Sequence, residues 1–299
     1  MFQVDDNTRL GCFIGGLIGD AAGAIYENRP PQPGQQLSLT AQPWQTTDDT
    51  QLTLASLEAI VKYKGVYPEK IAANFLAWYQ QKRLTGLGAA TLQALRGLQV
   101  GGHWALVGRS GEFAAGNGAA MRMAPLAFVP GMIQNRLLIK DVCNITHKND
   151  EAYTGALAIV LALHFIASGQ WHTPHDLYQY LLPQLPDTKV RDALQVAHQF
   201  NHLDIELFAR QFGNSGYVAE TVPLAIFAAS KVKKLGFEAM LTAIIRAGGD
   251  TDTIGSIAGQ LAGTYLGLAG LPPHLLTQAR QLSEFVAFEQ LAGGNAKSG

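Results

Sequence analysis

Two acidic clusters, far apart in the sequence, carry the residue types best suited to chemistry. Thr46–Thr50 reads TTDDT and Gly248–Thr253 reads GGDTDT. Brought together in space, their four carboxylates would repel one another unless a cation shared them. Carboxylate and hydroxyl oxygens, with no Cys or His between them, suit Mg²⁺, Mn²⁺ or Ca²⁺ rather than zinc or copper. The clusters therefore indicate a hard-metal site, with two ions as the working hypothesis.

Helix capping is the alternative explanation of these clusters. Each cluster precedes an apolar run of helical period, Gln51–Val61 or Ile254–Leu266. Asp and Thr are favoured N-cap residues, and an acid in the first turn is stabilised by the helix dipole. Capping accounts for one acid per cluster but not for two. It also leaves unexplained the Gly248-Gly249 pair, which frees the backbone for close approach.

Small residues fill the segment Gly15–Tyr26, which reads GGLIGDAAGAIY. They allow close packing of this helix against another helix or a ligand, and Asp20 then serves as a local hydrogen-bonding group. Glu27 follows at the end of the predicted helix. A glutamate there is unfavourable for the helix dipole, which favours a functional reason for it.

A glycine-flanked turn, Gly116-Asn117-Gly118, leads into another predicted helix. Its free N–H groups and the positive end of the helix dipole form an anion site. Capping by Asn117 explains the turn equally well. His147 lies between two predicted helices and is a candidate donor to a phosphate or sugar hydroxyl, although a lone histidine in such a turn is usually structural.

The composition predicts a soluble, cytoplasmic protein. With 47% hydrophobic and 15% charged residues, the 299-residue chain buries a sizeable core. A net charge of −1 gives no basic field for nucleic acid. Cys12 and Cys143 lack CxxC spacing and indicate reduced core thiols. The sequence shows no signal peptide, and Leu10–Ile25 is too interrupted to span a membrane, so we expect no membrane partner.

Helical periodicity recurs along the whole chain, whereas alternating patterns are almost absent. Two stretches, Arg29–Thr47 and Gly101–Gly118, lack it and are predicted to be loops. With no linker in between, residues 1–299 are expected to form a single all-α domain. The predicted helices are Thr8–Ala24, Asp49–Lys64, Pro68–Lys82, Gly88–Leu98, Ala119–Phe128, Asn135–Thr146, Asp150–Ser168, Pro174–Leu181, Lys189–His198, Ile205–Gln211, Thr221–Lys233, Gly236–Arg246, Thr253–Leu268 and Pro272–Leu291.

Five motifs, taken in order, resemble the ADP-ribosylglycohydrolase family, which includes the dinitrogenase-reductase-activating glycohydrolases. They read GCFIGGLIGDAAGAIYE, TTDDTQLTLA, AGNGAAMRMAPLA, THKNDEAYTGALA and AGGDTDTIGSIAG, and together span residues 11 to about 267. The resemblance implies a single compact orthogonal multi-helix domain with a dinuclear Mg²⁺ or Mn²⁺ site at its centre.

The resemblance also implies roles for individual residues, of three kinds. The implied metal ligands are Thr47, Asp48, Asp49, Asp250, Asp252 and Thr253. The implied ADP-ribose-binding residues are Gly116, Asn117, Gly118, His147, Gly248 and Gly249. Glu27 falls where some members carry a glutamate on a flap beside the metals, and it joins Asp49 and Asp252 as a candidate catalytic residue.

The chain departs from the family pattern at two places. Ala114 and Ala115 stand where many relatives have aromatic or hydroxyl side chains, so Phe113 or backbone N–H groups are expected to replace those contacts. The segment Thr85–Gly88 lacks an acid found in several arginine-directed members. An arginine-specific mechanism is therefore not transferred to this chain.

The implied activity is metal-dependent hydrolysis at the anomeric carbon of ADP-ribose attached to a protein side chain or a small acceptor, through an N- or O-glycosidic bond. The expected partner is an ADP-ribosylated protein or conjugate, and the chain is expected to be a monomer. A metal-dependent nucleotide phosphoesterase is the rival enzyme, because two hard ions suit phosphoryl displacement equally well. A non-catalytic ADP-ribose-binding or immunity protein is the third alternative.

Overall fold

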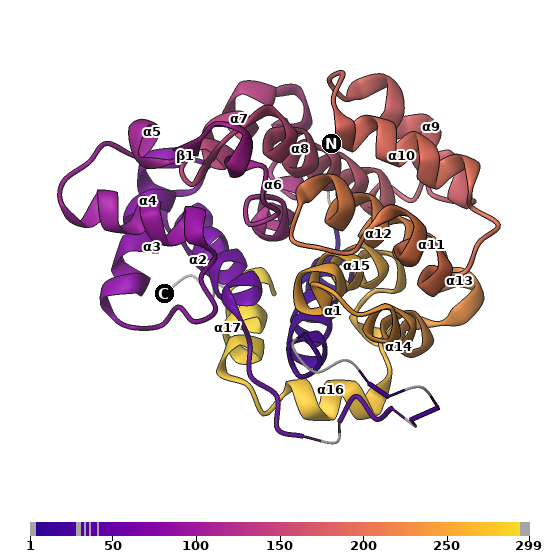
Figure 1. Ribbon diagram of the computed structural model, residues 1–299. Helices are drawn as coiled ribbons and strands as arrows, with labels where there is room; N and C mark the ends of the chain where they lie inside the picture. Colours follow the sequence, from indigo (N-terminus) through magenta and orange to yellow (C-terminus); the bar gives the residue numbers. More distant parts are fainter. Residues whose placement is uncertain (1–3, 28–30, 33, 36, 41, 294–299) are drawn as a thin grey trace.

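The protein is mostly helical, as the periodicity predicts (Figure 1). The computed structural model describes residues 4–27, 31–32, 34–35, 37–40 and 42–293, so parts of the predicted loop 29–47 lie outside it. Within these ranges the chain forms seventeen α-helices. The first nine are α1 (Asp6–Ala24), α2 (Asp48–Tyr63), α3 (Pro68–Gln80), α4 (Ala89–Gln99), α5 (Trp104–Val107), α6 (Ala124–Ala127), α7 (Arg136–Asn144), α8 (Asp150–Ala167) and α9 (Pro174–Leu181).

The second half of the chain supplies the remaining eight helices. They are α10 (Lys189–Gln199), α11 (Ile205–Phe212), α12 (Val218–Ser230), α13 (Val232–Leu235), α14 (Phe237–Ala247), α15 (Thr251–Leu266), α16 (Pro273–Ala279) and α17 (Ser283–Ala292). The 3₁₀ turns are η1 (Glu112–Ala114), η2 (Ala120–Arg122), η3 (Met132–Gln134), η4 (Leu182–Gln184) and η5 (Leu268–Gly270).

Two short strands pair a predicted loop with the predicted connection between two helices. β1 (Arg109–Ser110) pairs in parallel with β2 (His147–Lys148), and Arg109 lies opposite His147. Two-residue strands carry too little alternation to be recognised in a sequence. Their pairing fixes the loop after α5 beside the segment that links α7 to α8.

The predicted elements are wrong at four places. The predicted loop Gly101–Gly118 contains the short helix α5 and the turn η1. The expected helix Ala119–Phe128 is a 3₁₀ turn, η2, followed by the four-residue α6. The expected helix Pro272–Leu291 is divided into α16 and α17 at residues 280–282. α12 begins at Val218 rather than Thr221 and accommodates Pro223 within it, where a proline removes one backbone hydrogen bond.

The centre of the fold is a close antiparallel contact between α1 and α15, which lie side by side in Figure 1. Glycines recur every fourth residue on one face of α1, at positions 11, 15, 19 and 23. A Cβ atom on any of them would overlap backbone atoms of α15 or of the residue that follows it, Gly267. The glycines of α15 at 255, 259 and 263 face those of α1 in the same way. The two backbones therefore touch with no side chain between them, as in the small-residue contacts of membrane helices.

The remaining helices pack around this pair. α17 and α2 lie on one side of it, whereas α12 and α14 lie on the other (Figure 1). Phe13 of α1 stacks on Phe288 of α17, with ring centroids 5.2 Å apart. Among the described helices, α8 alone is long and apolar enough to cross a membrane, and 78% of it is buried within the protein. It therefore serves as a core helix of this fold.

The close contact predicts a strong response to a single methyl group. We expect Gly15→Ala to lower the free energy of unfolding by about 1–3 kcal/mol, because the new Cβ overlaps the carbonyl oxygen of Gly259 and forces the helices apart. Chemical denaturation measures this loss. Gly88→Ala is the matched control, since nothing lies within 4 Å of a Cβ there. Equal stability of the two variants would contradict the proposed packing role of Gly15.

Candidate metal centre and binding pocket

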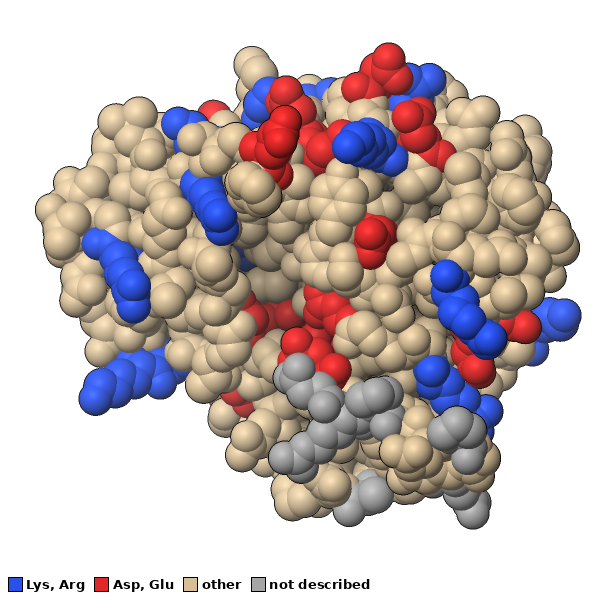
Figure 2. Space-filling view, viewed as in Figure 1, with Lys and Arg blue, Asp and Glu red and all other residues tan. Residues whose placement is uncertain are grey.

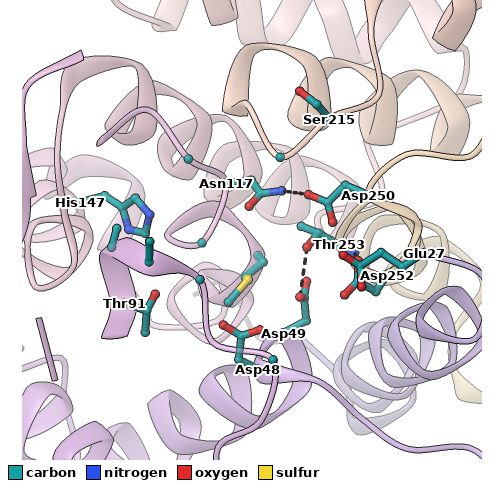
Figure 3. A pocket seen from close by; sticks show the side chains of 18 of the residues that line it. Glu27, Asp48, Asp49, Thr91, Asn117, His147, Ser215, Asp250, Asp252 and Thr253 are labelled. Atoms are coloured by element: carbon teal, nitrogen blue, oxygen red, sulfur yellow. Dashed lines mark hydrogen bonds between the residues drawn. The ribbon is translucent and has the colours of Figure 1, made fainter. Parts of the chain in front are cut away.

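Both acidic clusters open into one pocket of about 630 Å³. Figure 2 shows acidic side chains in the floor of this hollow, and Figure 3 shows how the lining residues face one another. The residues predicted from the sequence that line it are Glu27, Asp48, Asp49, Gly116, Asn117, Gly118, His147, Gly249, Asp250, Asp252 and Thr253. Two predicted site residues, Thr47 and Gly248, do not line it.

Thr47 and Gly248 instead lie at helix ends, each within two residues of the site acids in the sequence. Thr47 is the N-cap of α2, and its Oγ1 accepts a hydrogen bond from the N–H of Asp49 at 3.3 Å. Gly248 ends α14 with φ 72°, in the left-handed region that favours glycine. Their predicted roles as a metal ligand and a substrate contact stay predictions.

Asp20 of α1 holds the first acidic cluster in place through hydrogen bonds. Its fully buried carboxylate accepts hydrogen bonds from the backbone N–H and the hydroxyl of both Thr47 and Thr50, at 2.5–3.2 Å. Burial raises the pKa of Asp20 to about 6, against the effect of these bonds. Asp20, expected from the sequence to form only local hydrogen bonds, instead fixes the start of another helix: Asp48 and Asp49 are the first two residues of α2.

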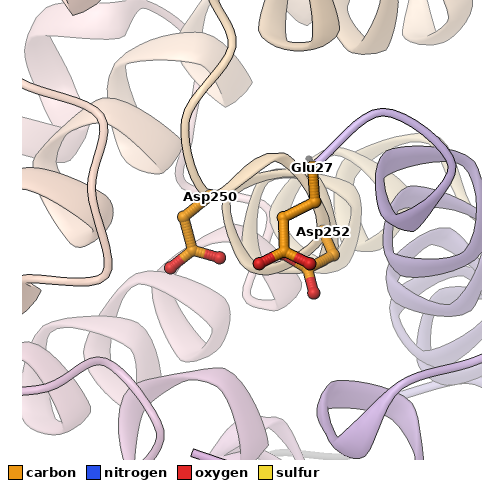
Figure 4. A group of neighbouring side chains, drawn as sticks. All are labelled: Glu27, Asp250 and Asp252. Carbon is orange, nitrogen blue, oxygen red and sulfur yellow. The ribbon is translucent and has the colours of Figure 1, made fainter. Parts of the chain in front are cut away.

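The α1–α15 contact brings Glu27 to the second acidic cluster. Thr251 at the start of α15 donates a hydrogen bond to the carbonyl of Gly23 at 2.8 Å. Glu27, three residues beyond the end of α1, consequently lies beside Asp250 and Asp252 (Figure 4). One carboxylate oxygen of each of these three residues lies within 4.8 Å of the others, close enough to share one cation.

One hydrogen bond joins the two acidic clusters, and another joins the second cluster to the glycine turn. The hydroxyl of Thr253 donates to Oδ2 of Asp49 at 3.1 Å, and Nδ2 of Asn117 donates to Oδ2 of Asp250 at 2.6 Å (Figure 3). Oδ1 of Asp49 is buried and has no hydrogen-bond partner among the described residues. A buried carboxylate oxygen without a partner is costly, and a divalent cation satisfies it. The oxygen-only donor set fits hard cations.

The pKa values of the acids show how strongly they are crowded. Burial, followed by repulsion from Asp20, raises the pKa of Asp48 to about 8. Burial and then the neighbouring Asp250 raise the pKa of Asp252 to about 9. The pKa of Asp49 is raised well above its ordinary value by burial and by Asp252. Without a cation, Asp48 and Asp252 therefore hold protons near neutrality in the folded protein.

The opposite side of the pocket carries the predicted anion site. Gly116 and Gly118 lie against the ring of His147, where a Cβ would come within 3.2 Å and 3.0 Å of ring atoms. The N–H of Asn117 donates to the carbonyl of Gly216 at 3.1 Å, which ties the turn to the loop before α12. Figure 3 shows His147 across the pocket from Glu27 and Asp252. The pocket thus has an acidic side and a side of backbone turns.

Several residues that line the pocket were not predicted from the sequence. Arg109 is half-buried, and its guanidinium has no hydrogen-bond or ion-pair partner among the described residues. Only the β1–β2 register, which the sequence does not reveal, places it here. Thr91 of α4 and the loop Asn214–Gly216 also line the pocket. The Asn-Ser-Gly composition of that loop was the one available signal, because such residues favour turns.

Proton binding predicts how the stability of the metal-free protein depends on pH. Carboxyls whose pKa is raised on folding contribute full stability below their unfolded pKa, about 4, and lose it as the pH rises through the folded values. We therefore expect the free energy of unfolding in a chelator to fall between about pH 5 and about pH 9. Asp252→Asn should flatten this decline, because it removes one such group.

Denaturation with and without Mg²⁺ or Mn²⁺ measures this dependence. Added cation should stabilise the wild-type protein more at the higher pH, since protons then compete less for the ligands. Asp192→Asn, on the exposed face of α10, is the control and should follow the wild type. The same pH slope in Asp252→Asn and wild type would contradict the assignment.

Comparisons with known proteins agree with this geometry. The profile of the ADP-ribosylglycohydrolase family matches residues 5–297. The chain is 26% identical to mouse ADP-ribosylhydrolase ARH3, covering 88% of this chain and 84% of that protein. It is 25% identical to the ADP-ribosyl-[dinitrogen reductase] glycohydrolase of Rhodospirillum rubrum, covering 90% and 89%.

Two further relatives extend these matches. The chain is 28% identical to the ADP-ribosylarginine hydrolase Tri1 of Pseudomonas putida, covering 88% of this chain and 71% of that protein. A solved structure of an ADP-ribosylglycohydrolase-related protein complex superposes with a TM-score of 0.72 over 96% of both chains, at 28% identity. With a profile match over nearly its whole length, this chain belongs to the ADP-ribosylglycohydrolase family.

Proposed function

We propose that this protein hydrolyses the glycosidic bond at the anomeric carbon of ADP-ribose attached to a protein side chain or small acceptor, releasing ADP-ribose. One observation carries the proposal. Five carboxylates, from the end of α1 and the starts of α2 and α15, meet on one side of a pocket whose other side is a glycine turn with a histidine and an arginine. Names of the relatives, which include ADP-ribosylhydrolases and an ADP-ribosylarginine hydrolase, support the same reaction class.

The acidic side is suited to hold two divalent cations, Mg²⁺ or Mn²⁺. Asp48, Asp49 and Thr253 form one face of the candidate site, and Asp250 and Asp252 with Glu27 form the other. When bound, such ions lower the pKa of a coordinated water and neutralise the crowded carboxylates. The unpartnered Oδ1 of Asp49 supports this assignment.

The remaining lining residues are suited to position the substrate. Backbone N–H groups of Gly116 and Gly118, with His147 and the unpaired guanidinium of Arg109, are suited to bind an anionic pyrophosphate. This end of the ligand is thereby held away from the acids, which would repel it. Its terminal ribose then lies at the acidic side. Positive charge that develops on the sugar ring in the transition state is stabilised there by the carboxylates.

Glu27 is our candidate for the group that moves a proton. Its side chain is exposed at the rim, where a leaving acceptor must pass. Partial burial and repulsion by Asp250 raise its pKa, so that it gives up a proton less readily than an ordinary glutamate. One carboxyl oxygen of Glu27 would protonate the leaving group or accept a proton from the attacking water.

Removal of one acid tests the metal assignment. We expect Asp252→Asn to lose most bound Mn²⁺ and to reduce kcat/KM for ADP-ribose release by about a hundredfold or more, because cation binding supplies several kcal/mol to such reactions. Metal analysis and chromatography of the products measure both effects. Asp192→Asn serves again as the control. Full activity and metal content in Asp252→Asn would refute the proposed site, and inorganic phosphate or AMP as product would favour a phosphoesterase.

Replacement of Glu27 tests the proton-transfer role separately. Glu27→Gln should lower kcat by about 10²–10⁴-fold, the usual contribution of general acid–base catalysis. Calorimetry should at the same time show substantial residual metal binding, since four aspartates remain. Glu69→Gln, on the exposed face of α3, controls for the substitution itself. An unchanged kcat would exclude Glu27 from proton transfer.

A further inference from the structure

A chain of polar contacts runs from a fully buried arginine to the pocket. Nη2 of Arg122, in η2, donates to Oγ1 of Thr146 at 2.5 Å. The same Oγ1 lies 2.8 Å from Nδ1 of His147, whose ring borders the pocket. All three side chains are buried, so each polar atom among them needs a protein partner where no ligand reaches it. Arg122 also donates through Nη1 to the carbonyl of Val142 at 3.5 Å. These contacts lie outside the acidic site and have no part in the function proposed so far.

The arginine fixes the direction of the first bond. A guanidinium has five N–H donors and no acceptor, so Oγ1 of Thr146 must accept from Arg122. Burial lowers the pKa of Arg122 to about 10, which still leaves it protonated near neutrality. Its position 5.0 Å from the centroid of the Phe75 ring adds a cation–π contact to this buried charge. Arg122 is therefore a charged donor to Thr146 near neutrality.

The direction of the second bond follows from the hydroxyl proton of Thr146. Among the described residues, Arg122 and His147 are the only side-chain partners of this hydroxyl. If Nδ1 of His147 carried a proton, Oγ1 would accept twice and its own buried proton would have no acceptor. Leaving a buried donor unsatisfied costs about 1–3 kcal/mol. The proton of Thr146 therefore points to Nδ1, and the imidazole proton resides on Nε2.

Nε2 is the ring nitrogen that faces the glycine turn. It lies 3.2 Å from the place where a Cβ of Gly116 would be, and 3.4 Å from the corresponding place at Gly118. The two glycines leave this nitrogen uncovered on the side of the pocket. Burial lowers the pKa of His147 to about 3, with a further contribution from Arg122, so the ring is neutral.

We propose that Arg122 and Thr146 are positioning residues that hold His147 as the Nε2–H tautomer, so that it presents a fixed neutral donor to an anionic oxygen of the ligand. The identity of this oxygen, a phosphate oxygen of ADP-ribose, rests on the proposed function. The tautomer itself does not. A neutral imidazole in the opposite tautomer would direct a lone pair at the phosphate and repel it.

Nuclear magnetic resonance tests the tautomer directly on the full chain. Long-range ¹H–¹⁵N correlation spectra distinguish protonated from unprotonated ring nitrogens, and the loss of one signal set in His147→Gln assigns the residue among the eight histidines. We expect a protonated Nε2 and an unprotonated Nδ1 in the wild type, unchanged between about pH 6 and about pH 8. A protonated Nδ1 would overturn the proposal without any variant of Thr146.

Two substitutions at Thr146 then test the hydrogen-bond chain from Arg122 through Thr146 to His147, called the relay below. Thr146→Val keeps the shape of the side chain and removes the hydroxyl, so Nδ1 should become protonated in part or completely. The Kd for ADP-ribose should rise by about tenfold, the usual effect of one hydrogen bond to a charged group. Thr146→Ser should restore both the tautomer and the Kd. If Thr146→Ser restored neither the tautomer nor the Kd, Thr146 would have only a structural role and the relay would be refuted.

The choice of ligand separates this inference from the proposed function. ADP retains the pyrophosphate and should show the same loss of affinity in Thr146→Val, whereas adenosine should show none. In turnover, KM should rise while kcat changes little, because the contact acts on bound substrate and transition state alike. Should the wild type show the expected tautomer but neither bind nor release ADP-ribose, the proposed function fails and the relay stands. Unchanged tautomer and Kd in Thr146→Val overturn the relay alone.

Discussion

The direct backbone contact between α1 and α15 is the constraint on which the rest of the structure depends. Because glycines line both helices, their axes approach more closely than side chains would allow. This contact positions both acidic clusters of the site. Asp20 of α1 holds the start of α2, while the end of α1 delivers Glu27 to the start of α15. Any change in the spacing of this pair therefore changes the spacing of the carboxylates.

The buried aspartates have different structural roles because their hydrogen-bond partners differ. Asp20 accepts four hydrogen-bond donors from Thr47 and Thr50, and so is fully partnered. Asp49, at the start of α2, has a buried oxygen without a hydrogen-bond partner among the described residues. Folding thus places carboxyls where repulsion and burial oppose their ionisation. A cation that relieves this conflict would stabilise the fold as well as the site.

Much of this arrangement was predictable from the sequence, and the rest depends on contacts between distant segments. Periodicity predicts the main helices: α2, for example, begins at Asp48, one residue before its predicted start. The paired acids and the Gly-Asn-Gly turn were recognised because each motif is local. The division between α16 and α17 and the place of Arg109 were not, because tertiary packing and a two-residue strand pairing determine them. Asp20 was recognised as a hydrogen-bonding group, but its partners could not be predicted because they lie at the start of another helix.

The α1–α15 contact also has a consequence for how the chain folds. Its two helices come from opposite ends of the sequence, so the most central interaction is also among the least local. High contact order slows folding, because loop closure must precede the gain from the contact. During synthesis α1 leaves the ribosome long before its partner and must wait with its glycine face uncovered. The acidic centre is thus completed only when nearly the whole polypeptide has been made, which couples activity to an intact chain.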